Sequence, residues 1–176
     1  MRSSCLGLGL IFLSCQQSPP LLVREPDAIL HQFTAKNYRN NELDWFLTAE
    51  RGELYLGDKE NHLFGVHIIH YENGKRATEI SSRRAIQKEN EKTLLLEEDV
   101  IVRSITGRTL YAQELIWYEN EQLLVSHKPV KISLPSGDII EGQSLKADKR
   151  LNKITLKEGR GVHPTYEEDG SRERNS

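Results

Sequence analysis

The sequence predicts an all-β fold, a repetitive antiparallel arrangement in which two sheets form a rolled, V-shaped pair around an apolar interior groove. From Leu43 onward, short apolar segments alternate with turn signals, which is typical of β-sandwiches, barrels and stacked β-rolls. No segment after Cys15 has a helical period longer than three turns. The apolar segments also recur at a step of about 30 residues, which indicates a repeat architecture.

Length and composition are those of a single folded domain. The chain has 176 residues, of which 37% are hydrophobic and 28% are charged, so it can bury a core that folds without disulfides. Its formal net charge is -2 and its pI is about 6.3. This composition excludes a disordered chain and lacks the basic footprint of a nucleic-acid-binding protein. We therefore expect no nucleic-acid partner.

Residues 1–15 have the features of a bacterial signal peptide. Arg2 precedes an apolar run from Cys5 to Leu13, which is much shorter than the roughly 20 residues that span a bilayer. The run ends in Phe-Leu-Ser-Cys, which is similar to a lipobox, so Cys15 is expected to begin the mature protein and to carry a lipid anchor. The alternative is an ordinary signal peptide cleaved nearby. No thiol follows Cys15, which excludes a later disulfide or cysteine metal site.

Three segments are expected after the signal peptide. Residues 16–27 hold three of the six prolines and show no periodicity, so they predict a flexible tether. The folded domain is expected at residues 28–161, and the polar stretch 162–176 is expected to be disordered. At the start of the domain, Ile29–Tyr38 fits either a short helix or a strand, and a strand is favoured. Seven turn signals then separate the expected strands: Asn61, Glu72–Gly74, Glu89–Glu91, Thr106–Gly107, Glu119–Glu121, Ser136–Asp138 and Lys149–Asn152.

An internal repeat explains why apolar alternation breaks inside these strands. A large apolar residue is followed two places later by a small residue. The third inward residue comes three places after the small one, which is one place more than strict alternation allows. The pattern recurs at offsets of 33, 30 and 30 residues as Leu47/Ala49/Gly52, Ile80/Ser82/Ala85, Leu110/Ala112/Leu115 and Ile140/Gly142/Leu145. A second series lies between the copies at Phe64, Leu94, Leu124 and Ile154. Coincidence is the alternative, but the shared defect predicts a bulge or bend where a large side chain would clash.

The sequence contains no recognisable catalytic or metal-binding motif. His62, His67 and His70 are close in the sequence, but His67 and His70 would face opposite sides of a strand. Solvent-facing or turn positions are therefore favoured over a metal site. Glu97–Asp99 is expected to be a solvated turn and not a general acid-base pair. Because phosphate loops, nucleophile elbows and metalloprotease helices are also absent, we expect neither enzymatic activity nor a cofactor.

The inward positions define a candidate binding groove. If the corners roll the sheets open, these positions line one apolar channel with room for acyl chains. If the sheets close, the same residues form an ordinary packed core. The residues are Leu94, Leu96, Val100, Val102, Leu110, Ala112, Leu115, Trp117, Leu124, Val130, Ile132 and Ile140.

Several segments, taken in order, resemble the LptC family, the periplasmic component of the bacterial lipopolysaccharide export system, and more distantly the LptA/OstA-like proteins. They are Pro26–Asp27, Trp45–Glu50, Glu98–Val102, Leu110–Leu115 and Lys128–Ile132. The resemblance implies a β-jellyroll that binds the lipid A acyl chains of lipopolysaccharide without catalysis. Such a protein would receive lipid from an inner-membrane ABC transporter and pass it to a periplasmic LptA-like protein.

The resemblance also implies two partner surfaces. Early strands would meet the transporter, and the last strand, expected at 152–158, would offer its edge to the LptA-like protein by strand addition. The residues expected at these edges are Phe33, Trp45, Leu47, Ala49, Ile154 and Leu156.

The chain departs from the LptC family in two places. A lipid on Cys15 would replace the usual N-terminal transmembrane helix, and Glu98–Asp99 replaces a usual Gly-Asn. We therefore expect a periplasmic lipoprotein anchored in the inner membrane in preference to the outer membrane. The alternative is a structural or assembly lipoprotein of the envelope, with a closed core and the same edge strands for binding partners.

Overall fold

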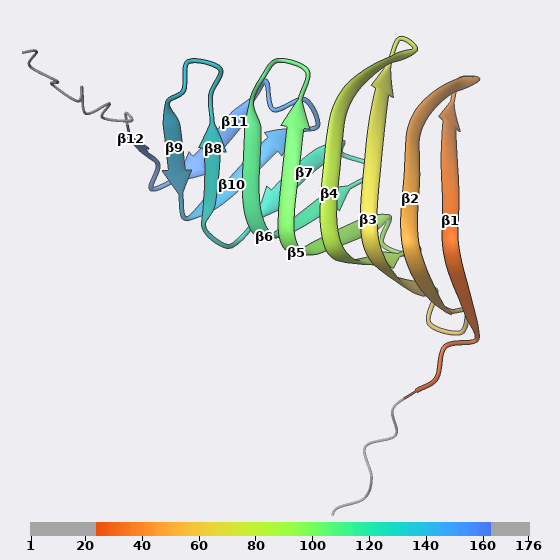
Figure 1. The fold of residues 1–176 in the computed structure, drawn as a ribbon. Coiled ribbons are helices and arrows are strands. Elements are labelled where there is room, and N and C mark those ends of the chain that lie inside the picture. The colour runs from red at the N-terminus through yellow and green to blue at the C-terminus, as the bar shows by residue number, and fades with distance from the viewer. Residues whose placement is uncertain (1–23, 163–176) are drawn as a thin grey trace, which may run out of the picture.

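The structure is a computed structural model that describes residues 24–162. Its regular elements in this part of the chain are antiparallel strands, which confirms the predicted all-β fold (Figure 1). The ambiguous segment Ile29–Tyr38 lies inside a strand. The strands are β1 (Ala28–Arg39), β2 (Glu42–Tyr55), β3 (Glu60–Glu72), β4 (Lys75–Lys88), β5 (Thr93–Ser104), β6 (Thr109–Tyr118), β7 (Leu123–Ser126), β8 (Val130–Ser133), β9 (Ile139–Gly142), β10 (Ser144–Asp148), β11 (Ile154–Lys157) and β12 (Arg160–Val162).

Several expected features of the termini fall outside these residues. The signal peptide, the lipidation of Cys15, most of the 16–27 tether and the tail beyond residue 162 are not described. Between residues 24 and 162, no helix is long and apolar enough to cross a membrane.

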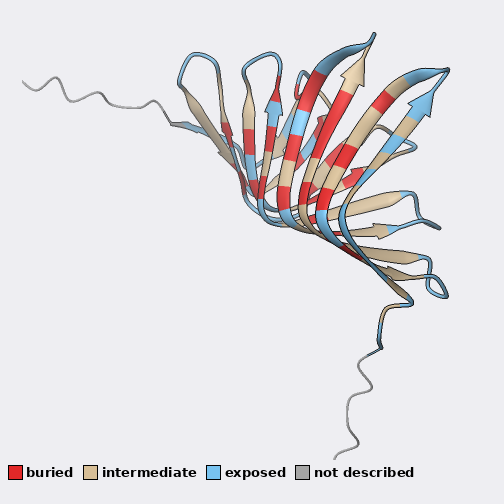
Figure 2. Ribbon diagram, turned by 45° about the vertical axis from the view of Figure 1, so that its right-hand side comes forward, coloured by how far each residue is buried: buried red, intermediate tan, exposed pale blue. Residues whose placement is uncertain are grey.

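The strands form two layers that join along one side and separate on the other, giving a V (Figures 1 and 2). The long strands β1–β6 curve through the junction and serve both layers. In β6, Thr109–Ala112 pairs with β8, whereas Ile116–Tyr118 pairs with β7. The first layer then continues from β8 through β9 to β12, and the second continues from β7 through β10 to β11.

The predicted break in alternation occurs where the strands pass from one layer to the other. In β6, Leu110, Ala112 and Leu115 are buried, whereas Gln113 is exposed and Glu114 is half-buried. β2 and β4 have the same spacing of buried residues. In the fourth copy the strand itself is interrupted. β9 ends at Gly142 and β10 begins at Ser144, so a single residue, Gln143, lies between the two strands. The break in side-chain alternation therefore marks the corner of the V.

Glu98 and Asp99 lie in a bulge inside β5, which corrects the prediction of a turn there. The φ angles of these two residues are 62° and 54°, and the strand continues without interruption on both sides. The register with β6 shifts between Glu97 and Val100, so the pair stands opposite the single residue Gln113. The extra residue increases the local bend and returns Val100 to the inward face.

Glycines at the corners confirm that large side chains would clash there. A Cβ on Gly142 would lie 3.0 Å from the Cβ of Leu156. A Cβ on Gly52 would lie 2.7 Å from Cε1 of Phe33. Both neighbouring side chains face the interior, so another heavy atom at either glycine would force its neighbour to shift.

The second repeat series is wrong at Phe64. Leu63 and Val66 are buried, whereas Phe64 is half-buried and its ring centroid lies 5.5 Å from the Arg51 guanidinium. Gly65, with φ of 60°, adopts the left-handed conformation that glycine accepts most readily. The strand changes phase at this glycine, so Leu63 and not Phe64 is the inward residue.

The hydrophobic core fills the junction between the layers. Val102, Leu110, Leu115 and Ile132 are each 0% exposed, and burial of each such side chain contributes about 1.5–3 kcal/mol. Away from the junction, apolar burial is incomplete. Seven hydrophobic residues are only partly buried against the core: Phe33, Ala35, Trp45, Leu94, Leu134, Ile154 and Leu156.

Candidate functional site

An apolar groove of about 290 Å³ lies at the β1 end of the V. Its walls come from both layers, because strands of each layer direct alternate side chains into the space between them. Polar residues of the β4–β5 and β6–β7 turns complete the lining. The apolar wall residues include Trp45, Leu47 and Ile68 from the first layer and Leu54, Leu63 and Leu94 from the second.

A second apolar cavity of about 390 Å³ lies at the other end of the V, near β9 and β11. Ile140 comes from the first layer, and Ile154 and Leu156 come from the second. Arg108 and Asn152 add polar groups to its lining. The interior is therefore open at both ends, with the packed core between the two cavities.

The predicted groove residues are divided between the groove near β1, the far cavity and the packed core between them. Leu94, Leu96 and Trp117 line the groove near β1, and Ile132 and Ile140 line the far cavity. The remaining residues are buried in the continuous core that joins them: Val100, Val102, Leu110, Ala112, Leu115, Leu124 and Val130. The open-channel and packed-core interpretations therefore each describe part of the interior.

The predicted edge residues are only partly on edge strands. Phe33 lies on β1, which pairs with β2 alone. Trp45, Leu47 and Ala49 lie on β2, whose backbone pairs with β1 on one side and β3 on the other, so their assignment to an edge is wrong. Their side chains instead line the groove or join the core.

The far end of the V has two edge strands where one was expected. Ile154 and Leu156 lie on β11, which pairs only with β10 and closes the second layer. The strand is shorter than the expected 152–158, because Asn152 and Lys153 belong to the preceding turn. β12 follows and forms the corresponding edge of the first layer by pairing with β9.

His70 is a groove residue that the sequence did not predict, since a solvent-facing or turn position was expected. It is 3% exposed, and its ring centroid lies 5.2 Å from that of Trp117. Burial and, to a smaller extent, the charge of Lys149 lower the pKa of His70 to about 4, against the opposing effect of Asp44. The imidazole is therefore neutral at pH 7, and its Nδ1 has no hydrogen-bond partner among residues 24–162.

The other two histidines of the cluster do not join it in a metal site. His67 faces outward, where its Nε2 lies 2.6 Å from Glu79, and this hydrogen bond lowers the pKa of Glu79. His62 lies 2.5 Å from Glu60. No group of three or more His, Cys, Asp or Glu side chains within residues 24–162 is arranged to hold a metal ion.

The acidic cluster at the β5 bulge is held by ion pairs with β4. Asp99 lies 2.6 Å from Arg83, and Glu97 lies 3.4 Å from Arg84. Opposite charges on neighbouring strands stabilise the sheet. These carboxylates therefore have a structural role at the bend.

A comparison with solved structures supports the fold assignment. The crystal structure of LptH from Pseudomonas aeruginosa, described as the LptA-homologous periplasmic component of the lipopolysaccharide transport device, is similar with a TM-score of 0.55 and 10% sequence identity. The alignment covers 69% of this chain and 95% of LptH. At this identity the likeness shows the fold alone, and it confirms the jellyroll-like arrangement. A comparison with curated proteins gave no match.

The family assignment comes from the sequence. The family model described as "Lipopolysaccharide-assembly, LptC-related" matches residues 4–166, which include every strand of the V. This match confirms the resemblance carried by the repeated strands. The chain belongs to the LptC-related family of lipopolysaccharide-assembly proteins.

Proposed function

We propose that this protein is a non-enzymatic bridge that binds lipopolysaccharide and conducts it along the interior of the V. It would receive lipid from an inner-membrane ABC transporter at the β1 end and pass it to an LptA-like protein at the β11 and β12 end. The observation that carries this proposal is an apolar interior that opens into a cavity at each end. A closed sandwich would leave no such openings.

The groove suits acyl chains better than a polar ligand. Each methylene that leaves water contributes about 0.8 kcal/mol, and the walls offer mainly aliphatic and aromatic side chains. The volume of about 290 Å³ is at the lower end of the range for ligand pockets. We therefore propose that the acyl portion enters this groove while the sugar headgroup stays outside.

The edge strands offer a means of joining neighbours at both ends. β1 leaves one side of its backbone unpaired, and β11 and β12 do the same at the far end. Such edges bind partners by adding a strand to the sheet. A lipid on Cys15 would tether the module to the periplasmic face of the inner membrane, with the β1 end nearer the anchor.

Photocrosslinking in cells tests the bridge function. A photoactivatable residue at Leu94 or Ile140 should capture lipopolysaccharide, because these side chains line the two cavities. The same residue at Arg103, which is exposed, is the control and should capture none. Absence of adducts at both interior positions would contradict the proposal.

The closely packed centre favours the alternative of an assembly lipoprotein that needs no open channel. Leu94→Trp separates the two functions, because it fills the groove near β1. The bridge predicts fewer lipid adducts at Ile140, whereas the alternative predicts a change in stability alone. Leu95→Trp is the matched control, because Leu95 is the adjacent strand residue and does not line the groove.

A further inference from the structure

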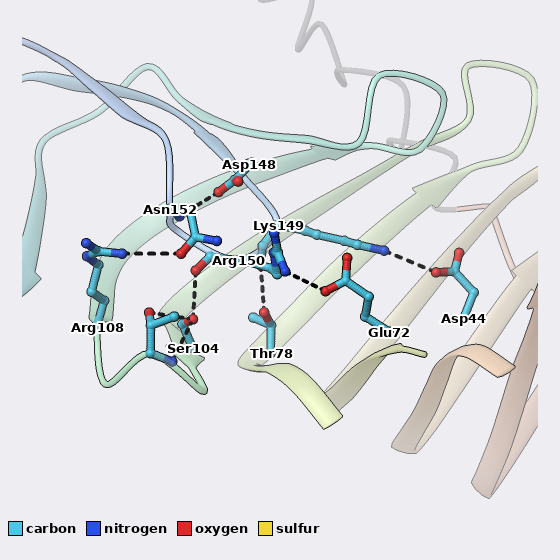
Figure 3. A network of polar contacts seen from close by, with 10 residues as sticks. Asp44, Glu72, Thr78, Ser104, Arg108, Asp148, Lys149, Arg150 and Asn152 are labelled. Atoms are coloured by element: carbon cyan, nitrogen blue, oxygen red, sulfur yellow. Dashed lines mark hydrogen bonds and ion pairs between the residues drawn. The ribbon is translucent and has the colours of Figure 1, made fainter. Parts of the chain in front are cut away.

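The β10–β11 turn, residues 148–153, crosses the mouth of the V; we call it the strap. It extends from the rim of the second layer to the rim of the first (Figure 3). Lys149 Nζ lies 3.2 Å from Oδ1 of Asp44 on β2. Arg150 lies 2.6 Å from Glu72 at the end of β3. Two consecutive cations of the strap therefore reach two strands of the opposite layer.

Hydrogen bonds to the strap backbone reinforce these ion pairs. The Thr78 hydroxyl donates to the carbonyl of Lys149, and the Ser104 hydroxyl donates to the carbonyl of Arg150, each at 2.7 Å. The Arg108 guanidinium donates to the carbonyl of Leu151 at 3.1 Å. Three successive carbonyls of a turn are thus bound by side chains of the opposite layer, which is more than a simple β-turn requires.

The strap has its own internal support. The Asp148 carboxylate accepts hydrogen bonds from the backbone N–H groups of Asn152 and Lys153 at 2.7 and 3.3 Å. Leu151 has a φ of 56° and is 0% exposed, so its side chain is held in the core although it belongs to a turn. This shape allows the strap to bridge the layers as a preformed unit.

The strap lies between the two cavities. At one end of the strap, Lys149 bonds to Asp44, and its charge lowers the pKa of His70, which lines the groove near β1. Its Asn152 end lines the far cavity together with Arg108. Any long apolar ligand that moves from one cavity to the other must therefore pass the strap and the buried Leu151.

We propose that the strap is a gate that closes the interior of the V and must release the first layer before lipid moves from the groove to the far cavity. This inference rests on the proposed bridge function and adds a control point to it. The contacts that hold the strap to the first layer are polar and lie at the mouth, so opening withdraws only Leu151 from the core and leaves the core residues at the junction packed. Opening requires the ion pairs of Lys149 and Arg150 to break together with the hydrogen bonds that the first layer donates to the three strap carbonyls.

A reversible crosslink between the two layers tests the gate. Asp44→Cys with Lys149→Cys places one thiol on each layer where the two side chains now meet across the mouth at 3.2 Å, and a bis-maleimide crosslinker with an internal disulfide joins them and locks the strap shut. With photoactivatable residues at Leu94 and Ile140 of the full chain, the locked form should keep lipopolysaccharide adducts at Leu94 and lose them at Ile140. Reduction of the crosslinker should restore the Ile140 adduct, and each single cysteine variant treated with the same reagent should not lose Ile140 adducts relative to Leu94.

The outcomes separate the two proposals. Loss of adducts at both positions in the reduced protein would reject the bridge function itself. Equal Ile140 adducts in the locked and reduced forms would reject the gate and leave the bridge intact. As a second variant, Lys149→Glu with Arg150→Glu places like charges opposite Asp44 and Glu72, and it should raise the ratio of Ile140 to Leu94 adducts. An unchanged ratio would also reject the gate.

Discussion

Replacement of His70 by glutamine should make the protein less sensitive to acid. In the folded state, burial lowers the pKa of His70 from 6.5 to about 4. In the unfolded chain the imidazole titrates near its ordinary value of about 6.5. Between these two pKa values, the unfolded state binds a proton that the folded state does not accept.

This difference sets the sign and size of the effect. Above about pH 7 the imidazole is neutral in both states, so its contribution is independent of pH. As the pH falls from 6.5 toward 4, the free energy of unfolding decreases by up to about 1.4 kcal/mol per pH unit. The total loss is about 3 kcal/mol, a large part of the roughly 5–15 kcal/mol that stabilises a typical domain.

Urea unfolding at pH 7.5 and pH 4.5, followed by tryptophan fluorescence, measures this loss. Trp45 and Trp117, the two tryptophans of the chain, both line the groove. The wild-type protein should lose about 2.5 kcal/mol more than His70→Gln between these pH values. Acid titration of carboxylates such as Glu79 is common to both proteins and cancels in the difference. Equal losses would refute the reasoning, and His31→Gln, at an exposed position on β1, should match wild type.

Three further predictions address packing and the strap. Leu110→Ala should lower the free energy of unfolding by about 2–5 kcal/mol, because it leaves a cavity in the closed core; a loss below about 1 kcal/mol in urea unfolding would contradict that packing. Gly52→Ala should cost about 1–3 kcal/mol, because the new methyl group displaces Phe33, whereas Gly161→Ala meets no atom within 4 Å and should be nearly neutral in the same assay. Thr78→Val should speed amide hydrogen exchange in the strap, and unchanged exchange rates would show that this hydroxyl does not hold it.

Local patterns in the sequence were sufficient to predict the architecture. The spacing of Leu110, Ala112 and Leu115 reports the corner directly, because the face of each side chain follows from its position along one strand. The same logic failed at Phe64, where Gly65 changes the phase within two residues. A single glycine in a strand does not reveal, from sequence alone, on which side of it the alternation continues.

Features that depend on contacts between distant strands could not be predicted. His70 has the parity of an inward residue, but only the position of Trp117 on the opposite layer shows that it is covered. β2 could not be distinguished from an edge strand without knowledge of its second neighbour. The strap had no signal beyond a turn, because Lys149 and Asp44 are 105 residues apart.

The two halves of the V differ in how the backbone joins the layers. β1–β6 are continuous through the corner, so opening the angle there would require each of these strands to straighten. Beyond β6, the layers are made of separate short strands, connected through His127–Pro129, Gln143 and Glu158–Gly159. A change of angle at that end needs rotation only in these linking residues once the strap has released the first layer. The β1 end is therefore the stiffer one, and the spacing of the layers can vary most at the β9 and β11 end, where the proposed function has lipid leave the protein.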